Sequence, residues 1–142
     1  MRTKEYTALF IFSLAIFAWI GLAQAQKAKT VQLPNGEEVV DIRGEWDVHR
    51  ENYGIWSDLG NYSNILKIEL QGNSFVGIRM MNDKEHSAGT TAIQGELDKD
   101  GIKKVQIIKH RHTLDAKGHI SEDGNKIIID DGVKVRLTLI RK

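Results

Sequence analysis

The chain has 142 residues and no cysteine, which excludes a disulfide framework and a lipid-anchored lipoprotein. Of its 20 basic and 19 acidic residues, Arg2, Lys4 and Glu5 precede residue 26, which leaves 18 of each sign beyond it and a formal net charge of zero. A neutral domain lacks the basic excess of nucleic-acid-binding proteins, so we expect no nucleic-acid partner.

The N-terminal segment has the three parts of a secretory signal. Arg2 and Lys4 are followed by an uncharged, mostly apolar run over residues 7–23, and Ala23-Gln24-Ala25 supplies small residues before a cleavage point after Ala25. Residues 1–25 are therefore predicted to be a signal peptide, and the mature protein to be exported to the periplasm or the extracellular space. The alternative is a retained anchor, for which the run is at the lower length limit. After cleavage we expect no stable membrane span.

Beyond the signal, residues 26–38 are interpreted as a polar leader followed by a short turn, and residues 39–142 as one domain. Apolar and polar residues alternate along this domain, which is typical of strands with one buried face. Glycine-containing turns separate the alternating runs. We expect eight strands, at about residues 39–49, 64–71, 74–81, 90–98, 103–110, 113–120, 125–130 and 133–141.

Eight short antiparallel strands with one apolar face must hide that face and their edges, and closure into a barrel achieves both. The predicted fold class is therefore all-β, a single antiparallel up-and-down eight-stranded barrel. A β-sandwich is the alternative, but it usually requires longer connections than most of those in this chain.

The sequence Gly44-Glu45-Trp46 on the first strand resembles the calycin group of barrels, which includes the lipocalins. The mature layout as a whole is similar to small bacterial secreted lipocalin-like domains. The resemblance implies that Gly44 bends the strand at the closed end and that Trp46 forms the barrel floor. It also implies that Arg141, which is in phase with Leu137 and Leu139, stacks on that tryptophan.

Residues 50–63 form the longest predicted connection and contain Tyr53, Trp56 and Tyr62. If the first strand starts at the closed end, this segment lies at the open mouth, where lipocalins place a ligand-gating loop. We expect these aromatics to guard the mouth, and Ile78, Met80 and Ile93 to line the interior. The alternative is that the aromatics plug a barrel without a cavity.

The sequence contains no motif that indicates catalysis, and we expect no enzyme activity, no catalytic residue and no cofactor. His110 and His112 would share a strand face, but the basic residues beside them are typical of a solvated turn, so we expect no metal site. The leading hypothesis is an exported lipocalin-like module that binds a small apolar or amphipathic molecule. The alternative is a filled-core barrel that acts through its surface as an envelope or interaction protein.

Overall fold

The computed structural model describes residues 27–142; the predicted signal peptide lies outside the described residues. The elements, in chain order, are β1 (Thr30–Gln32), β2 (Glu38–Val40), β3 (Gly44–Asn52), the 3₁₀ helix η1 (Gly54–Leu59), β4 (Tyr62–Gln71), β5 (Ser74–Arg79), β6 (Thr91–Asp98), β7 (Gly101–Lys109), β8 (His112–Ile120), β9 (Lys126–Asp130) and β10 (Val135–Arg141). The predicted all-β class is confirmed.

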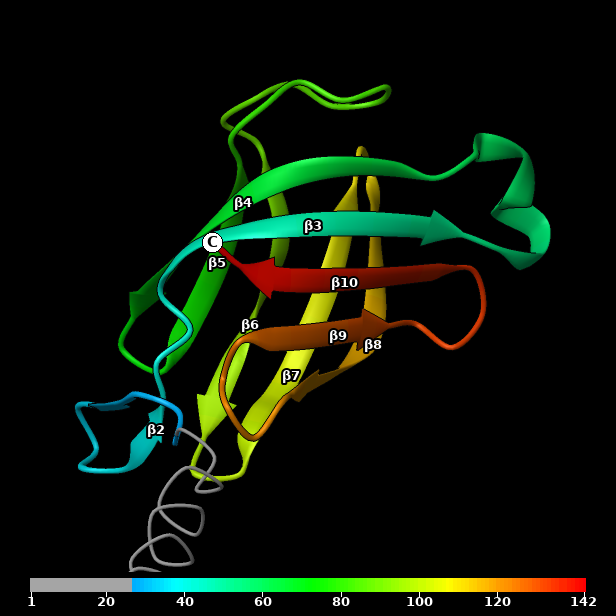
Figure 1. The fold of residues 1–142 in the computed structure, drawn as a ribbon. Coiled ribbons are helices and arrows are strands. Elements are labelled where there is room, and N and C mark those ends of the chain that lie inside the picture. The colour runs from blue at the N-terminus through cyan, green and yellow to red at the C-terminus, as the bar shows by residue number, and fades with distance from the viewer. Residues whose placement is uncertain (1–26) are drawn as a thin grey trace, which may run out of the picture.

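Strands β3 to β10 form a closed antiparallel barrel in the order β10-β3-β4-β5-β6-β7-β8-β9. Each strand pairs with its neighbour in sequence, and β10 closes the barrel by pairing with β3. Figure 1 shows β4, β3, β10 and β9 as one wall crossing in front of the other wall, which contains β5 to β8. The predicted barrel is therefore confirmed, and the sandwich alternative is wrong.

The first predicted strand, 39–49, is two separate strands in the structure. β2 ends at Val40 and pairs only with β1, whereas the barrel strand β3 starts at Gly44. Between them, the Asp41 side chain accepts hydrogen bonds from the backbone and the guanidinium of Arg43. Gly44 has φ +114°, which side chains disfavour, so the chain turns there before entering the barrel.

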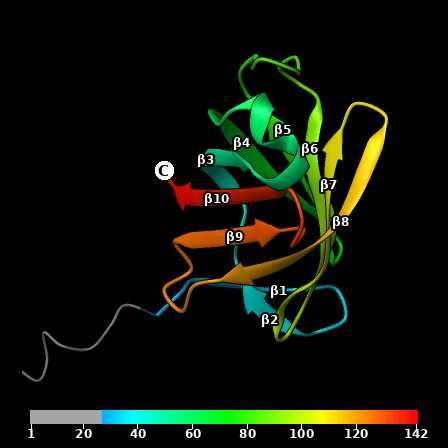
Figure 2. The ribbon, with the colours of Figure 1, turned by 90° about the vertical axis from the view of Figure 1, so that its right-hand side faces the viewer.

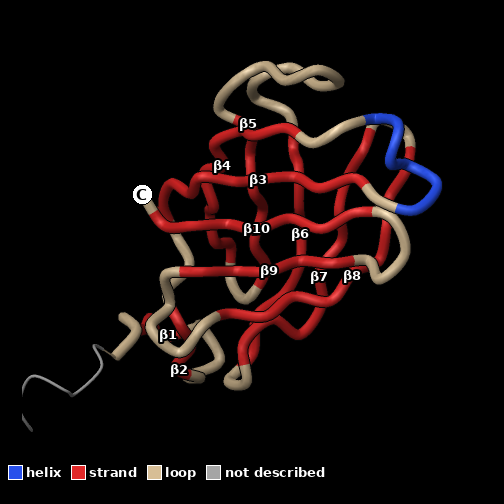
Figure 3. The backbone as a smooth tube through the Cα atoms, turned by 45° about the vertical axis from the view of Figure 1, so that its right-hand side comes forward, coloured by secondary structure: helices blue, strands red, loops and turns tan. Residues whose placement is uncertain are grey.

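The two ends of the barrel differ in their connections. The β1–β2 hairpin and the C-terminus lie at one end (Figures 1 and 2). Helix η1 and the connection 80–90 lie at the other end (Figure 3). We call these the closed end and the open end.

The apolar core fills the closed half of the barrel. Each strand contributes alternate inward residues, as the pleat requires. Fully buried side chains include Ile42, Trp46, Leu66, Ile68, Ile93, Leu97, Val105, Ile107, Ile127, Ile129, Val135 and Leu139. Leu33 and Val39, from the turn after β1 and from β2, belong to the same core and cover the closed end from outside the barrel.

The inward face of β5 differs from the sequence prediction. The turn after β4 places Leu70 opposite Phe75, so that Phe75, Gly77 and Arg79 point inward. Opposite residues of an antiparallel pair lie on the same face of the sheet. Ile78 and the residue that follows the strand, Met80, consequently lie outside the barrel, where Met80 is 43% exposed.

Candidate functional site

At the closed end, Trp46 and Arg141 form a compact unit. Trp46 is fully buried, and its Nε1 donates a hydrogen bond of 2.9 Å to the carbonyl oxygen of Ile42. The Arg141 guanidinium lies 4.3 Å from the centre of the indole ring, and its Nη2 donates to the carbonyl oxygens of Asp41 and Gly124. These contacts tie β3 and β10 to the segments that cover the closed end, which makes this unit structural.

The open end is built differently, because its inward residues are polar. Arg50 and Asn52 continue the inward face of β3 beyond Val48, and Lys109 continues that of β7. Arg79 is the last inward residue of β5. All four of these polar side chains are buried, and a buried charge is costly unless it is paired.

The three predicted aromatics all lie at the open end, in different roles. Tyr53 donates a 2.6 Å hydrogen bond to Asp130, and this bond is the main reason that the pKa of Tyr53 is raised to about 12. The Trp56 ring lies between two ammonium groups, 4.2 Å from Lys109 Nζ and 4.6 Å from Lys134 Nζ. Of the three aromatics, only Tyr62 lines the pocket described next.

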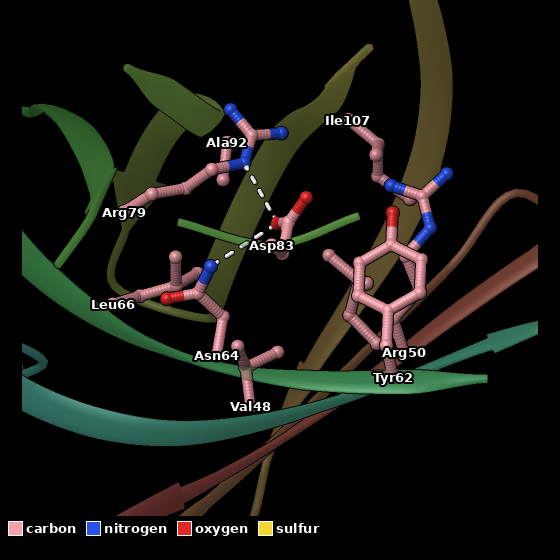
Figure 4. Close-up of a pocket in the computed structure, with 10 residues that line it drawn as sticks. Val48, Arg50, Tyr62, Asn64, Leu66, Arg79, Asp83, Ala92 and Ile107 are labelled. Atoms are coloured by element: carbon pink, nitrogen blue, oxygen red, sulfur yellow. Dashed lines mark hydrogen bonds and ion pairs between the residues drawn. The ribbon is translucent and has the colours of Figure 1, made fainter. Parts of the chain in front are cut away.

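A pocket of about 30 Å³ opens into the barrel at this end. Half of its lining residues are apolar, namely Val48, Leu66, Ala92, Ile107 and Leu137. The other half are polar, and Figure 4 shows them converging on the pocket: Arg50, Tyr62, Asn64, Arg79 and Asp83. This volume exceeds what one water molecule needs, but it is about a tenth of the smallest typical ligand pocket.

Asp83 comes from the connection between β5 and β6 and reaches down into the pocket (Figure 4). Its Oδ2 accepts a hydrogen bond from Asn64 Nδ2 and lies 3.7 Å from Arg79 Nε. Its Oδ1 accepts from the backbone N–H groups of Glu85 and His86. Burial by itself raises the pKa of Asp83, but these hydrogen bonds outweigh it and lower the pKa below the usual value.

Glu85 comes from the same connection and contacts Lys109 of β7 and Tyr62 of β4. Its Oε1 lies 3.1 Å from Lys109 Nζ, and its Oε2 accepts a 3.0 Å hydrogen bond from the Tyr62 hydroxyl. Burial opposes ionisation, but the bonds from Lys109 and Tyr62 lower the pKa of Glu85. Burial raises the pKa of Tyr62 far above its usual value, so Tyr62 remains a hydrogen-bond donor.

His86 completes this layer over the barrel. Its ring stacks on that of His110 with centroids 4.6 Å apart, and its Nδ1 lies 3.2 Å from Asp83 Oδ1. Burial and the nearby Arg79 lower the pKa of His86, so the ring is neutral at pH 7. The buried side chains of residues 81–90 are polar, with Asp83 and His86 each 5% exposed, and no apolar side chain of this range is buried, so this connection is held over the open end by polar contacts.

The other predicted ligand-binding residues do not meet at the pocket. Ile93 is fully buried, but its side chain contacts the Gly77 position in the filled part of the core. Ile78 and Met80 are outside the barrel, so their predicted interior position is wrong. The physical reason is that β5 has apolar residues on both faces, and the hairpin register selects Phe75 for the inside.

The buried charges of the open end were not predicted from the sequence. Arg50 is two residues beyond Val48, and Lys109 two beyond Ile107, so continued alternation places both inside. The sequence prediction instead assigned Arg50 to the connection 50–63 and interpreted the basic residues beside His110 and His112 as a solvated turn. Asp83 and Glu85 carry no such signal, because they lie in a connection without periodicity.

Two further searches cover residues 27–142. In this range, no group of three or more histidine, cysteine, aspartate or glutamate side chains is arranged to hold a metal ion. The same residues include no helix that has both the length and the apolar character needed to cross a membrane.

Comparison with protein-family models finds no family that matches the chain. Comparisons with curated proteins and with solved structures likewise find no match. The closed eight-stranded antiparallel barrel is compatible with a lipocalin-like fold.

Proposed function

We propose that the protein is an exported, lipocalin-like binding module for a small amphipathic molecule, which it takes up at the open end of the barrel. The observation that carries this proposal is the mixed lining of the pocket, with apolar side chains on one part of the wall and buried hydrogen-bonding groups on another. Ligand sites typically combine an apolar lining with a few fixed polar groups.

The connection over residues 80–90 is where a ligand could enter the pocket. It covers the open end without burying any apolar side chain between positions 81 and 90, and Gly89 has φ +85°. A segment held by polar contacts alone can be displaced at lower cost than one packed into the core. Because the pocket of about 30 Å³ is too small for a whole ligand, binding requires this segment or its side chains to move.

The small volume of the pocket also favours a second candidate function. The closed half of the barrel is filled, as expected of a barrel that acts through its surface and takes no small ligand. Under this alternative the buried polar groups of the open end would serve only to hold the connection 80–90 in place.

Two measurements separate these functions. Native mass spectrometry of the protein purified from its own host without denaturation should show a co-purifying small molecule. In parallel, titration with 11-(dansylamino)undecanoic acid should give saturable 1:1 binding.

A matched pair of variants locates the binding site. Ala92→Leu narrows the pocket and should weaken binding of the probe by about tenfold or more, whereas Ser74→Leu, at the exposed start of β5 and outside the pocket, should leave it unchanged. If the protein carries no co-purifying molecule and no amphipathic probe binds saturably, the filled-core function is correct.

A further inference from the structure

The buried charges of the open end do not balance. Three cations, Arg50, Arg79 and Lys109, are buried there. The carboxylates that reach them are Asp83, which faces Arg79, and Glu85, which faces Lys109. With His86 neutral, the cluster carries one positive charge more than it carries negative charges.

Arg50 is the one of these three cations that forms no ion pair among the described residues; the Glu85 carboxylate attracts it only from a longer distance. Its Nε donates a 3.1 Å hydrogen bond to Asn52 Oδ1, and its guanidinium lies 5.5 Å from the centre of the Tyr62 ring. Its Nη2 is buried and has no hydrogen-bond partner within residues 27–142. Arginine does not lose its proton in proteins, so burial leaves this group charged and unpaired.

The unpaired group belongs to a wall of the pocket. Arg50 is 5% exposed and lines the pocket together with Tyr62, Val48 and Leu137. Nη2 itself is covered, so a negatively charged group that entered the pocket would reach this desolvated donor once neighbouring side chains moved, and it would bring the charges of the cluster to balance. A charge-assisted hydrogen bond of this kind is about twice as strong as a neutral one.

The geometry points to a carboxylate as that group: we propose that the open end binds the carboxylate of a small acid with an apolar chain, and that Arg50 is its partner. This inference rests on the proposed function and names the ligand's chemical class. One uncompensated positive charge matches a singly charged carboxylate better than a doubly charged phosphate. The apolar lining accounts for the chain that carries the carboxylate.

Glu85 shows how the protein itself holds a carboxylate at this position. Its two oxygens engage Lys109 and the Tyr62 hydroxyl, and Tyr62 in turn faces Arg50. Glu85 therefore repels an incoming acid and competes with it for the Tyr62 hydroxyl. Asp83 holds the connection to the barrel through Asn64 of β4 and Arg79 of β5, so Glu85 can turn outward while these contacts remain.

Isothermal titration with three ligands of equal chain length tests the proposal: decanoate, decanamide and decyl phosphate. We expect decanoate to bind at least about tenfold more tightly than decanamide, the ratio expected of one charge-assisted hydrogen bond. Arg50→Gln should reduce this preference to about one, while Arg136→Gln, on the exposed outer face of β10, should preserve it. Glu85→Gln should strengthen decanoate binding severalfold.

A thermal melt of each variant distinguishes binding from folding. Since Arg50 has an unpaired buried charge, Arg50→Gln should melt no lower than the parent protein while it loses the preference for decanoate. Equal binding of decanoate and decanamide would overturn the carboxylate site and leave the proposed function standing. Tighter binding of decyl phosphate would also overturn it, and failure of all three ligands would overturn both.

Discussion

Replacing Trp46 by alanine should remove a large part of the stability of the barrel. The side chain is fully buried among the core residues of the closed half. Truncation of a buried tryptophan to alanine typically costs about 3–5 kcal/mol. The Ile42 carbonyl also loses its donor at 2.9 Å, which adds about 1 kcal/mol, and Arg141 loses the ring at 4.3 Å, which adds about 0.5–1 kcal/mol.

The expected loss for Trp46→Ala is therefore about 4–7 kcal/mol, against a total stability of about 5–15 kcal/mol for a typical domain. Urea unfolding followed by far-ultraviolet circular dichroism measures this loss without depending on tryptophan emission. Trp46→Phe is the matched control, because it keeps an aromatic ring under Arg141 and removes the Nε1 donor; its loss should be about 1–2 kcal/mol. A loss below about 1 kcal/mol for the alanine variant would refute the role of Trp46 as the floor of the barrel.

Two further predictions concern the sheet and the open end. Gly95→Ala should lower the free energy of unfolding by at least about 3 kcal/mol in urea, because the new Cβ would lie 2.1 Å from the rigid carbonyl oxygen of Lys104. The Cβ of Gly118→Ala would meet only a side chain, so this control should cost clearly less. Equal costs for the two variants would contradict this reasoning. Burial lowers the pKa of His86, so the unfolded chain takes up the proton first and stability should fall as the pH drops below the ordinary value of 6.5. His86→Gln should flatten this part of the pH profile. The hydrogen bonds that lower the pKa of Glu85 should cause a further loss of stability as the pH falls below the ordinary value of 4.5. A parent protein that becomes more stable on acidification would disprove both effects.

The barrel could be predicted from the sequence because most of its strands have one apolar and one charged face. In β3, Trp46 and Val48 alternate with Glu45, Asp47 and His49, and only one assignment of faces buries the apolar side chains and exposes the acidic ones. In β5 the two faces are similarly apolar, and the choice between Phe75 and Val76 is made by the turn that places Leu70 opposite Phe75. Alternation within a single strand cannot supply that information.

The candidate site was harder to predict for a different physical reason. Charged side chains usually point outward because only water can solvate them. At the open end, however, the connection 80–90 supplies carboxylates that pair with buried cations. Lys109 points inward because Glu85 reaches it across the open end, 24 residues away in sequence. Such a pairing depends on the closed barrel, so no local pattern reports it.

The two ends of the barrel make opposite contributions to stability, and this contrast bears on function. At the closed end the polar groups of the Trp46 and Arg141 side chains donate hydrogen bonds to backbone carbonyl oxygens of the segments that cover the core. At the open end Arg50 is buried without an ion pair, although a neutral residue there would avoid the cost of burying a charge. A barrel that acted only through its outer surface would gain nothing from such a charge. A barrel that binds an acid would need it, because the stability given up in the empty protein is recovered when the ligand's carboxylate pairs with Arg50.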